Sequence, residues 1–484
     1  MLNESLLAAL GEILPPSALL TAGEDTRPYE CDGLTLFRAQ PLAVLLPENE
    51  AQVVAILKIC SAAGLPVVAR GAGTGLSGGA TPDERGVVLS LAKFRRILAI
   101  DPLARSAVVQ PGVRNLAISE AAAPHGLYYA PDPSSQIACT IGGNVAENSG
   151  GLHCLKYGLT VHNVRRVRGV LVTGEIVEFG NDALDSAGYD LLALINGSEG
   201  LLAVTTEVTV RLTPKPKDAK CILAAFDDLT KAGDAVAGIF AAGIIPAGLE
   251  MMDRLTISAV EPFAHSGYPL DAEAILLCES DGTPEEVQAE IEEMRALLES
   301  MGATQVEVSQ NEAQRLRFWS GRKASFPAAG RISPDYYCID GTIPRRSIAP
   351  VLARIAEFGK EFGLRCMNVF HAGDGNLHPL ILFDANCPGD VEKTEAFGAR
   401  ILELCIEVGG TITGEHGVGI EKLGGMCGQF TSAELEWFHA IKHAFDAAGL
   451  LNPGKAVPSL HRCAEMGRMY VHRGQLPHPE LPRF

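Results

Sequence analysis

The chain has 484 residues, 47% of them hydrophobic and 20% charged, which is the balance of a globular protein with two or three domains. Lys and Arg number 40 against 58 Asp and Glu, and the formal charge of −18 disfavours a protein that binds nucleic acid by neutralising its phosphates. No apolar run is long enough for a transmembrane segment, and the first residues lack the basic start of a signal peptide. We therefore expect a cytoplasmic protein.

Twelve cysteines are spread along the chain without a Cys-x-x-Cys pair. This spacing favours buried thiols in a reducing compartment over disulfides. Any iron–sulfur cluster would have to belong to a partner protein, because the close cysteine spacings that hold such clusters are missing.

The chain begins with a helix-rich segment at 1–36 and then changes to a β-α-β pattern. A strand is predicted at 43–46, and Asn49 can cap a helix that Gly64 ends. Strands continue to residue 212, where Thr-Pro-Lys-Pro follows. We therefore place the first domain at 37–216.

The first glycine-rich stretch, 70–80, directly follows a short apolar strand. Glycines let a backbone approach a ligand closely, and successive N–H groups in such a turn can form a nest for an anion. The spacing Gly-x-Gly-x-x-Gly occurs at 73–78, but a strand at 87–91 follows instead of the helix that a Rossmann site requires. The pattern predicts a pyrophosphate cradle between two strands.

A second glycine-rich stretch lies at 131–151, where glycines alternate with small hydroxyl and amide residues. Such a segment can offer many hydrogen bonds to an elongated polar ligand. Ile137, Ile141 and Val145 add apolar anchors, which predicts a packed loop and not an ordinary surface loop.

The second predicted domain, 217–445, alternates strands with amphipathic helices. Strands at 222–226, 248–252, 273–279 and 305–308, with helices at 229–242 and 284–301, follow the order β-α-β-β-α-β. This order predicts a ferredoxin-like antiparallel sheet with helices on one face. Residues 446–484 form a C-terminal segment that we expect to return to the first domain.

Two histidines of the second domain flank an Asp-Gly pair, which is a strong signal for a two-residue hairpin turn. If Asp374 and Gly375 form that turn, His371 lies directly opposite His378. Opposed side chains have Cβ atoms ~5 Å apart, which suits one metal ion. The plain alternative is a pair of structural histidines near a turn.

A third metal ligand is available in the sequence Gly-Glu-His-Gly at 414–417. The flanking glycines free the backbone to deliver Glu415 and His416 into a site. Two histidines and a carboxylate suit Zn²⁺ or Mn²⁺ with positions open for a substrate.

Several of these motifs resemble one known family. The stretches 70–80, 131–151, 197–202 and 452–455 are similar to the FAD-binding domain of the vanillyl-alcohol-oxidase (PCMH) type. The stretches 318–323, 331–338 and 463–469 extend the likeness over nearly the whole chain, to the FAD-linked catalytic subunits of bacterial glycolate oxidase. The resemblance implies an α+β protein with a PCMH-type FAD-binding domain and a ferredoxin-like antiparallel-sheet cap domain.

The resemblance also implies which residues hold FAD, and it implies non-covalent FAD because the cradle has no histidine to form a tether. The residues implied to contact FAD are Arg70, Gly71, Ala72, Gly73, Thr74, Gly75, Leu76, Ser77, Pro131, Asp132, Thr140, Gly142, Gly143, Asn144, Ala146, Asn148, Gly150, Gly151, Glu199, Gly200 and Asn452.

In the related 2-hydroxy-acid dehydrogenases, the residues that match His371, His378 and Glu415 bind a divalent metal. The residue that matches His416 is the general base, and the match of Arg322 grips the substrate carboxylate. The implied reaction passes the α-hydrogen of a 2-hydroxy acid to flavin N5 and yields a 2-oxo acid.

The chain departs from the 2-hydroxyglutarate branch of the family at two positions. Phe326 and Cys338 stand where that branch has a threonine and a lysine for a distal carboxylate. This favours a small substrate, and glycolate and D-lactate both stay open.

The resemblance further implies a second flavin subunit and an iron–sulfur subunit, which would attach the protein peripherally to the inner membrane. The tail at 461–484 carries basic and apolar residues that suit either a partner surface or a solvated tail. Three other readings stay open: a D-lactate dehydrogenase, a non-catalytic scaffold subunit that carries FAD and metal, and an NAD-dependent enzyme.

Overall fold

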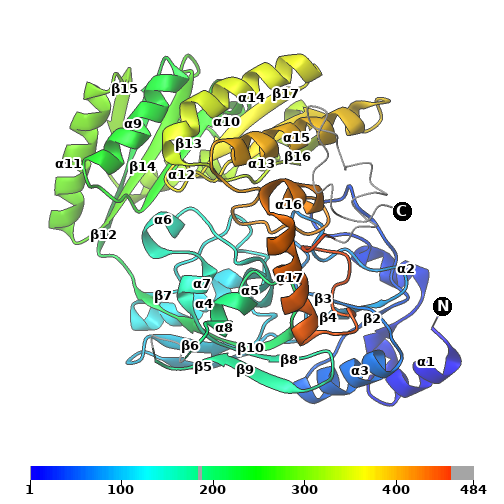
Figure 1. The fold of residues 1–484 in the computed structure, drawn as a ribbon. Helices are drawn as coiled ribbons and strands as arrows, with labels where there is room; N and C mark the ends of the chain where they lie inside the picture. The colour runs from blue at the N-terminus through cyan, green and yellow to red at the C-terminus, as the bar shows by residue number, and fades with distance from the viewer. Residues whose placement is uncertain (1, 184–187, 459–484) are drawn as a thin grey trace. The chain divides into compact units, whose positions relative to one another are not determined.

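The computed structural model describes residues 2–183 and 188–458, so the tail at 461–484 and the 463–469 motif lie outside the described residues. The chain divides into two compact units (Figure 1). The first comprises the described parts of 1–151 and 158–214 and the chain from Glu415; the second comprises Leu152–Tyr157 and Lys215–Gly414. The return to the first unit thus begins at Glu415, where we had expected it at 446. Within the part of the chain that the structure describes, no helix is long and apolar enough to cross a membrane.

The first unit begins with a four-stranded sheet in the order β1-β2-β4-β3. Strands β2, β4 and β3 run parallel, while β1 pairs antiparallel with β2. Helix α3 (Glu50–Ala62) connects β2 to β3 and begins where Asn49 Oδ1 accepts the N–H of Gln52 at 3.0 Å, as predicted. The elements of this part are α1 (Glu4–Gly11), α2 (Gly23–Thr26), β1 (Leu19–Leu20), β2 (Ala43–Leu45), β3 (Val67–Arg70) and β4 (Val87–Ser90).

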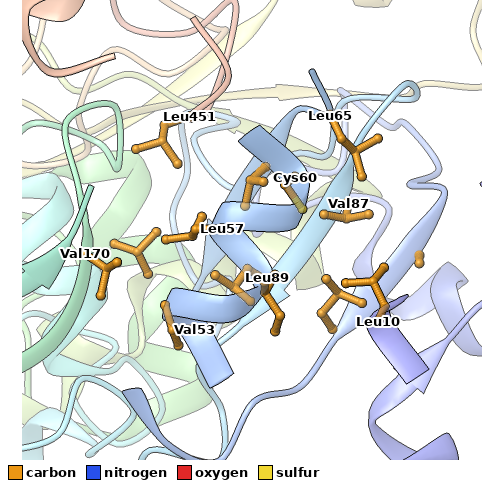
Figure 2. Packing of buried hydrophobic residues seen from close by; sticks show 14 of the residues in the cluster. Leu10, Val53, Leu57, Cys60, Leu65, Val87, Leu89, Val170 and Leu451 are labelled. Atoms are coloured by element: carbon orange, nitrogen blue, oxygen red, sulfur yellow. The ribbon is translucent and has the colours of Figure 1, made fainter. Parts of the chain in front are cut away.

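One apolar core lies between α3 and this sheet (Figure 2). The returning C-terminal chain joins it, because Leu451 pairs with Val67 of β3 and is fully buried. The labelled core residues are Leu10, Val53, Leu57, Cys60, Leu65, Val87, Leu89, Val170 and Leu451.

Truncation of one side chain in this core tests its contribution to stability. Leu57 is fully buried, so Leu57→Ala should lower the free energy of unfolding by about 2–5 kcal/mol through lost burial and the cavity left behind. Denaturant unfolding of the purified protein measures the change. The neighbouring Lys58 is exposed, and Lys58→Ala should change stability by less than about 0.5 kcal/mol. Equal losses in the two variants would contradict the assigned core.

A five-stranded antiparallel sheet in the order β5-β6-β10-β8-β9 completes the first unit. Its core also receives Ile441 and Phe445 from a helix of the returning chain. The strands are β5 (Ile97–Asp101), β6 (Ser106–Val109), β8 (Val164–Val170), β9 (Ile176–Gly180) and β10 (Val204–Arg211), with the small pair β7 (Leu127–Tyr128) and β11 (Thr213–Pro214). The helices are α4 (Asn115–Ala122), α5 (Ile141–Glu147), α7 (Thr160–Asn163), α8 (Leu191–Ile195), α16 (Leu423–Gln429) and α17 (Ser432–Phe445).

The second glycine-rich stretch is packed, as predicted, but its anchors differ. Ile141 and Val145 are buried on helix α5, which the glycines had concealed in the sequence. Ile137 was wrongly expected to be an anchor: its side chain is 66% exposed. It precedes the helix in a turn, so it does not share the apolar face that α5 presents to the core.

The second unit is built on one seven-stranded sheet in the order β15-β12-β14-β13-β17-β18-β16 (Figure 1). The first four strands have the order predicted for the ferredoxin-like pattern, and β17, β18 and β16 extend the sheet with antiparallel pairs. The strands are β12 (Asp218–Phe226), β13 (Gly248–Asp253), β14 (Ala274–Gly282), β15 (Gln305–Val308), β16 (Asp335–Cys338), β17 (Arg365–Phe370) and β18 (Pro379–Phe383).

Helices cover both faces of this sheet, so the expectation of helices on one face is wrong. Alternate residues of β12, such as Leu223 and Ala225, pack in a core with Ile257 and Phe318 from α10 and α12. Their neighbours in β12 are equally buried on the opposite face, since a strand of continuous apolar residues hides both faces. The helices are α6 (Cys154–Tyr157), α9 (Leu229–Ala241), α10 (Arg254–Ala264), α11 (Pro284–Ser300), α12 (Glu312–Lys323), α13 (Ser325–Ile332), α14 (Ile348–Phe362) and α15 (Asp390–Glu407).

Candidate active site

The cradle of the first unit is a glycine turn pressed against a second loop. A Cβ atom on Gly71 would lie 2.4 Å from Thr140 Oγ1, so only glycine permits this approach. Gly73 has φ +72°, a left-handed conformation that favours glycine. The hydroxyls of Ser77 and Thr140 are buried and have no hydrogen-bond partner within the described ranges. Buried hydroxyls of this kind fit a site that binds a polar ligand.

The N-terminal segment holds the cradle in shape. Nη1 of Arg70, a predicted cofactor-binding residue, donates to Cys31 O at 2.7 Å, and the guanidinium lies 5.6 Å from the centre of the Tyr29 ring. The N–H of Gly33 donates to Gly75 O at 2.9 Å. Burial raises the pKa of the neighbouring Asp32 to about 6. The Arg70–Cys31 and Gly33–Gly75 hydrogen bonds join residues about 40 positions apart, so no short sequence motif could have predicted them.

The second loop is organised by buried amides. Asn115 Nδ2 donates to Pro131 O at 3.1 Å and to Asn144 Oδ1 at 3.0 Å, which joins the start of the loop to helix α5. Asn148 has φ +51° and ends that helix, and its Oδ1 accepts the N–H of Val161 at 2.9 Å. Gly151 contacts Asp132, because a Cβ there would lie 2.8 Å from Asp132 Oδ1. These contacts bring the two ends of the 131–151 stretch together and join its start to helix α5.

The segment that begins at Glu415 is held by Glu199 and contacts the end of the 131–151 stretch. The N–H groups of Val418 and Gly419 donate to the two carboxylate oxygens of Glu199, each at 2.7 Å. A Cβ on Gly150 would lie 2.7 Å from Glu415 Oε2. Both oxygens of Glu199, a predicted cofactor-binding residue, therefore hold the segment that carries Glu415 and His416.

Asn452 connects this anchor to the cradle. Its Nδ2 donates to Gly79 O at 3.0 Å and to Glu199 O at 2.6 Å. Within the first unit, the cradle therefore contacts the 131–151 stretch at Thr140, and that stretch contacts Glu415 at Gly150.

The histidine hairpin of the second unit has a different turn from the one predicted. His371 pairs with Asn376, and the loop between them has four residues, closed by the N–H of Gly375 donating to His371 O at 2.9 Å. Asp374 does not sit in a two-residue turn, because its Oδ1 accepts the N–H of Asn376 at 3.0 Å. The expected direct opposition of His371 and His378 is therefore wrong.

The corrected register still places both histidines together. A register change by an even number leaves every side chain on its predicted face of the sheet. The ring centroids of His371 and His378 are 5.1 Å apart, and the ring planes are nearly perpendicular at 84°. Both side chains are buried, and Cys338 Sγ lies 3.9 Å from His378 Nδ1. The pair can hold one metal ion between its rings.

Arg322 joins this cluster through a carboxylate that the sequence analysis missed. Arg322 Nε donates to Glu250 Oε2 at 2.6 Å, and His371 Nδ1 lies 2.6 Å from Glu250 Oε1. Arg322 is 1% exposed, and its Nη2 is buried without a partner in the described part of the chain. The available signal was an acid inside the apolar strand β13, which an alternation pattern alone does not distinguish from a solvent-facing residue.

Within the described residues, buried polar groups with unused hydrogen-bonding capacity, in the glycine cradle of one unit and at Arg322 in the other, are typical of a protein that binds a cofactor and a charged substrate. The model "FAD binding domain" matches residues 41–180, and "FAD linked oxidases, C-terminal domain" matches residues 215–456. The chain belongs to the FAD-linked oxidase family. It is an FAD-dependent oxidoreductase, and the resemblance inferred from its motifs is confirmed.

Sequence relatives cover nearly the whole chain. "Glycolate oxidase subunit GlcD" of Escherichia coli K12 is 62% identical over 99% of this chain and 96% of the relative. The protein of the same name from Bacillus subtilis is 40% identical over 88% of this chain and 91% of the relative. "D-lactate dehydrogenase" of Archaeoglobus fulgidus is 33% identical over 94% of this chain and 99% of the relative.

A solved structure supports the fold assignment. The crystal structure of p-cresol methylhydroxylase with substrate bound matches with a TM-score of 0.80, over 94% of this chain and 97% of that one. The identity is 17%, so this likeness concerns the fold alone. The predicted combination of a PCMH-type FAD-binding domain and an antiparallel cap domain is confirmed.

Crowding the cradle should weaken FAD binding. In Gly71→Ala the new methyl group overlaps Thr140 Oγ1, and separating the two loops should cost about 1–3 kcal/mol, or ~10–100-fold in FAD affinity. The flavin-to-protein ratio after gel filtration and an FAD titration of the apoprotein measure it. Gly11→Ala is the control, because a Cβ there meets nothing within 4 Å. FAD affinity like that of the control would argue against the cradle.

Proposed function

We propose that the protein oxidises a small 2-hydroxy acid, with glycolate as the preferred substrate and glyoxylate as the product. The relatives named glycolate oxidase subunit support this substrate. One structural observation carries the proposal: buried Arg322, with Nη2 unpaired within the described chain, lies in the same cluster as the paired imidazoles. A carboxylate is the ligand that a buried guanidinium binds best.

The first unit fits FAD, because the glycine backbone of the cradle can approach a phosphate group closely and the buried hydroxyls of Ser77 and Thr140 can hydrogen-bond to a polar ligand. When bound, FAD supplies the flavin N5 that takes the hydrogen and two electrons from the substrate carbon. We propose that FAD binds non-covalently, because the 70–80 cradle has no histidine to which the flavin could be attached.

A divalent metal, Zn²⁺ or Mn²⁺, is proposed to bind His371, His378 and Glu415. Gly414 supports the third ligand: its N–H donates to Asp340 O at 2.9 Å, and a Cβ on it would lie 2.2 Å from Asn376 Nδ2. Asn376 pairs with His371, so Gly414 lies beside the histidine hairpin, and Glu415 is the residue that follows Gly414 in the chain. Such a metal lowers the pKa of a bound hydroxyl group as a Lewis acid.

The chain's own side chains have three proposed tasks. Arg322 pairs through its Nη atoms with the substrate carboxylate and orients the α-carbon. His416 takes the proton of the substrate hydroxyl, which the near-neutral reference pKa of histidine allows. Glu199 holds the backbone of the His416 segment through Val418 and Gly419. The hydroxyl proton would go to His416, and the α-hydrogen would leave as a hydride that carries both electrons, so the 2-hydroxy acid becomes a 2-oxo acid.

The residues beside the cluster favour a small substrate. Phe326 is partly buried, and its ring lies 5.9 Å from the Tyr336 ring, so this side chain packs against apolar neighbours and offers no hydrogen bond to a second carboxylate. Cys338 is buried beside His378 and offers no cation for a second carboxylate. D-lactate is the second candidate, because relatives bear the name D-lactate dehydrogenase.

The electron acceptor is proposed to be a protein partner. The relatives are named as subunits, which supports an assembly of several chains. We propose a second flavin subunit and an iron–sulfur subunit, with the protein cytoplasmic and held peripherally at the inner membrane by these partners.

Anaerobic substrate addition tests the proposed function. Glycolate should bleach the flavin absorbance of the purified protein in a single turnover, faster than D-lactate at the same concentration. Bleaching by D-lactate but not by glycolate would show that D-lactate is the substrate. An unchanged spectrum with both acids, in protein loaded with FAD and Mn²⁺ or Zn²⁺, would favour a scaffold role. Oxidation of glycolate with NAD as the sole acceptor would overturn the proposed acceptor.

A further inference from the structure

Glu250 links two residues of the proposed site through one buried carboxylate. It lies on β13 with 0% exposure. Its Oε2 accepts from Arg322 Nε and its Oε1 contacts His371 Nδ1, both at 2.6 Å. Each oxygen therefore serves a different side chain, and the two side chains come from separate elements, α12 and the end of β17.

A carboxylate is a costly choice for this place in the strand. Its neighbours Leu249 and Met251 are buried and apolar, and its cross-strand partner is Leu277. Burying a charge is unfavourable unless it is paired and hydrogen-bonded, and an apolar residue of similar size often stabilises such a site better. Packing alone therefore does not explain Glu250, whereas both of its partners have a task in the proposed reaction.

We propose that Glu250 is a positioning residue for this reaction, which rests on the proposed function. By accepting from Arg322 Nε, it turns the remaining guanidinium nitrogens toward a substrate carboxylate. By accepting from Nδ1–H of His371, it selects the tautomer whose Nε2 lone pair can bind a metal. One side chain thus orients the substrate anchor and the metal ligand together.

Glu250→Gln separates these effects from simple packing. The amide oxygen must face Arg322, which has only donors, so the amide NH₂ faces His371 Nδ1. This favours the tautomer with a proton on Nε2, which cannot bind a metal. The variant keeps the size of the side chain while it changes the hydrogen bonding of both partners.

Glu279 offers a matched control on the adjacent strand β14. It is 2% exposed and accepts from Arg315 Nη1 at 2.7 Å and from Trp319 Nε1, with His153 Nε2 at 3.1 Å. It thus resembles Glu250 in burial and partners, but Arg315, Trp319 and His153 are not proposed site residues. Glu279→Gln should lower thermal stability without changing the metal site.

The experiment titrates chelator-treated holoprotein with Mn²⁺ and Zn²⁺ and measures KM and kcat for flavin reduction by glycolate. E250Q should bind the metal about 10–100-fold more weakly and show a higher KM at saturating metal. E279Q should have a metal affinity and a KM within about twofold of wild type, because it also removes a buried carboxylate but, in the described chain, does not contact a proposed metal ligand or substrate-binding residue. Wild-type metal affinity and KM in folded E250Q would overturn the inference.

Two further outcomes keep the test decisive. If E250Q fails to fold, E250D replaces it, because the shorter side chain keeps the charge but cannot reach both partners; unchanged metal affinity and KM in E250D would equally overturn the inference. If glycolate does not reduce wild-type flavin, the proposed function fails. In that case the metal affinity of E250Q, compared with that of wild type, still tests whether Glu250 orients His371 for metal binding.

Discussion

His416→Gln should slow flavin reduction by glycolate by about 10²–10⁴-fold, the usual contribution of a positioned general base. FAD and metal should remain bound, because His416 is neither a cradle residue nor a proposed metal ligand. Glutamine keeps much of the size and can still donate a hydrogen bond, but it cannot take up the hydroxyl proton. Anaerobic stopped-flow measurement of flavin bleaching gives the rate, and absorbance with metal analysis gives the occupancy of both cofactors.

The control for this variant is His443→Gln, which removes a histidine from the exposed surface of α17 in the same unit. Its rate should match wild type. Undiminished flavin reduction in H416Q would remove His416 as the base. A loss that coincides with loss of FAD would show instead that the Glu415–His416 segment maintains the cofactor site.

Arg322→Met should raise the KM for glycolate about 10–100-fold, because a charged hydrogen bond to the substrate carboxylate contributes roughly 1.5–3 kcal/mol. The same change leaves Glu250 buried without its cation, which should lower the free energy of unfolding by about 3–5 kcal/mol. Steady-state kinetics with an artificial acceptor and denaturant unfolding measure the two effects. Methionine retains most of the volume, so an empty cavity is not the cause.

Lys323→Met provides the matched control, since Lys323 is the next residue on α12 but is exposed. It should leave KM and stability near the wild-type values. If R322M loses stability but binds glycolate with an unchanged KM, the Arg322–Glu250 pair is structural and the substrate carboxylate binds elsewhere. If neither quantity changes, the buried ion pair itself is in doubt.

Local signals were sufficient where a residue acts on its own backbone. Asn49 begins α3 because its side chain satisfies the N–H of Gln52, and this chemistry is visible in the sequence. The four ferredoxin-like strands were recognised because apolar runs alternate with amphipathic helices. The cradle was recognised from its glycine-rich spacing after a strand, and Gly73 indeed adopts a left-handed conformation with φ +72°.

Local signals failed where the outcome depends on a distant contact. The Asp-Gly pair favours a two-residue turn, but Asp374 instead accepts the N–H of Asn376, and a four-residue loop results. Ile137 has the composition of an anchor but lies outside the buried face of α5. An extended run such as β12 does not reveal whether one face or both will be covered.

The amino-acid sequence by itself indicated the family, the glycine cradle and the candidate metal ligands, and the resemblance to the family added the candidate base and substrate anchor. These features depend on residue types and spacings within short stretches of the chain, and both can be seen in the sequence. Only the tertiary structure decided that Glu250 joins Arg322 to His371 and that Glu199 holds the segment of His416. The partners in these pairs are 72, 121, 219 and 220 residues apart, so folding alone brings each carboxylate to its donors.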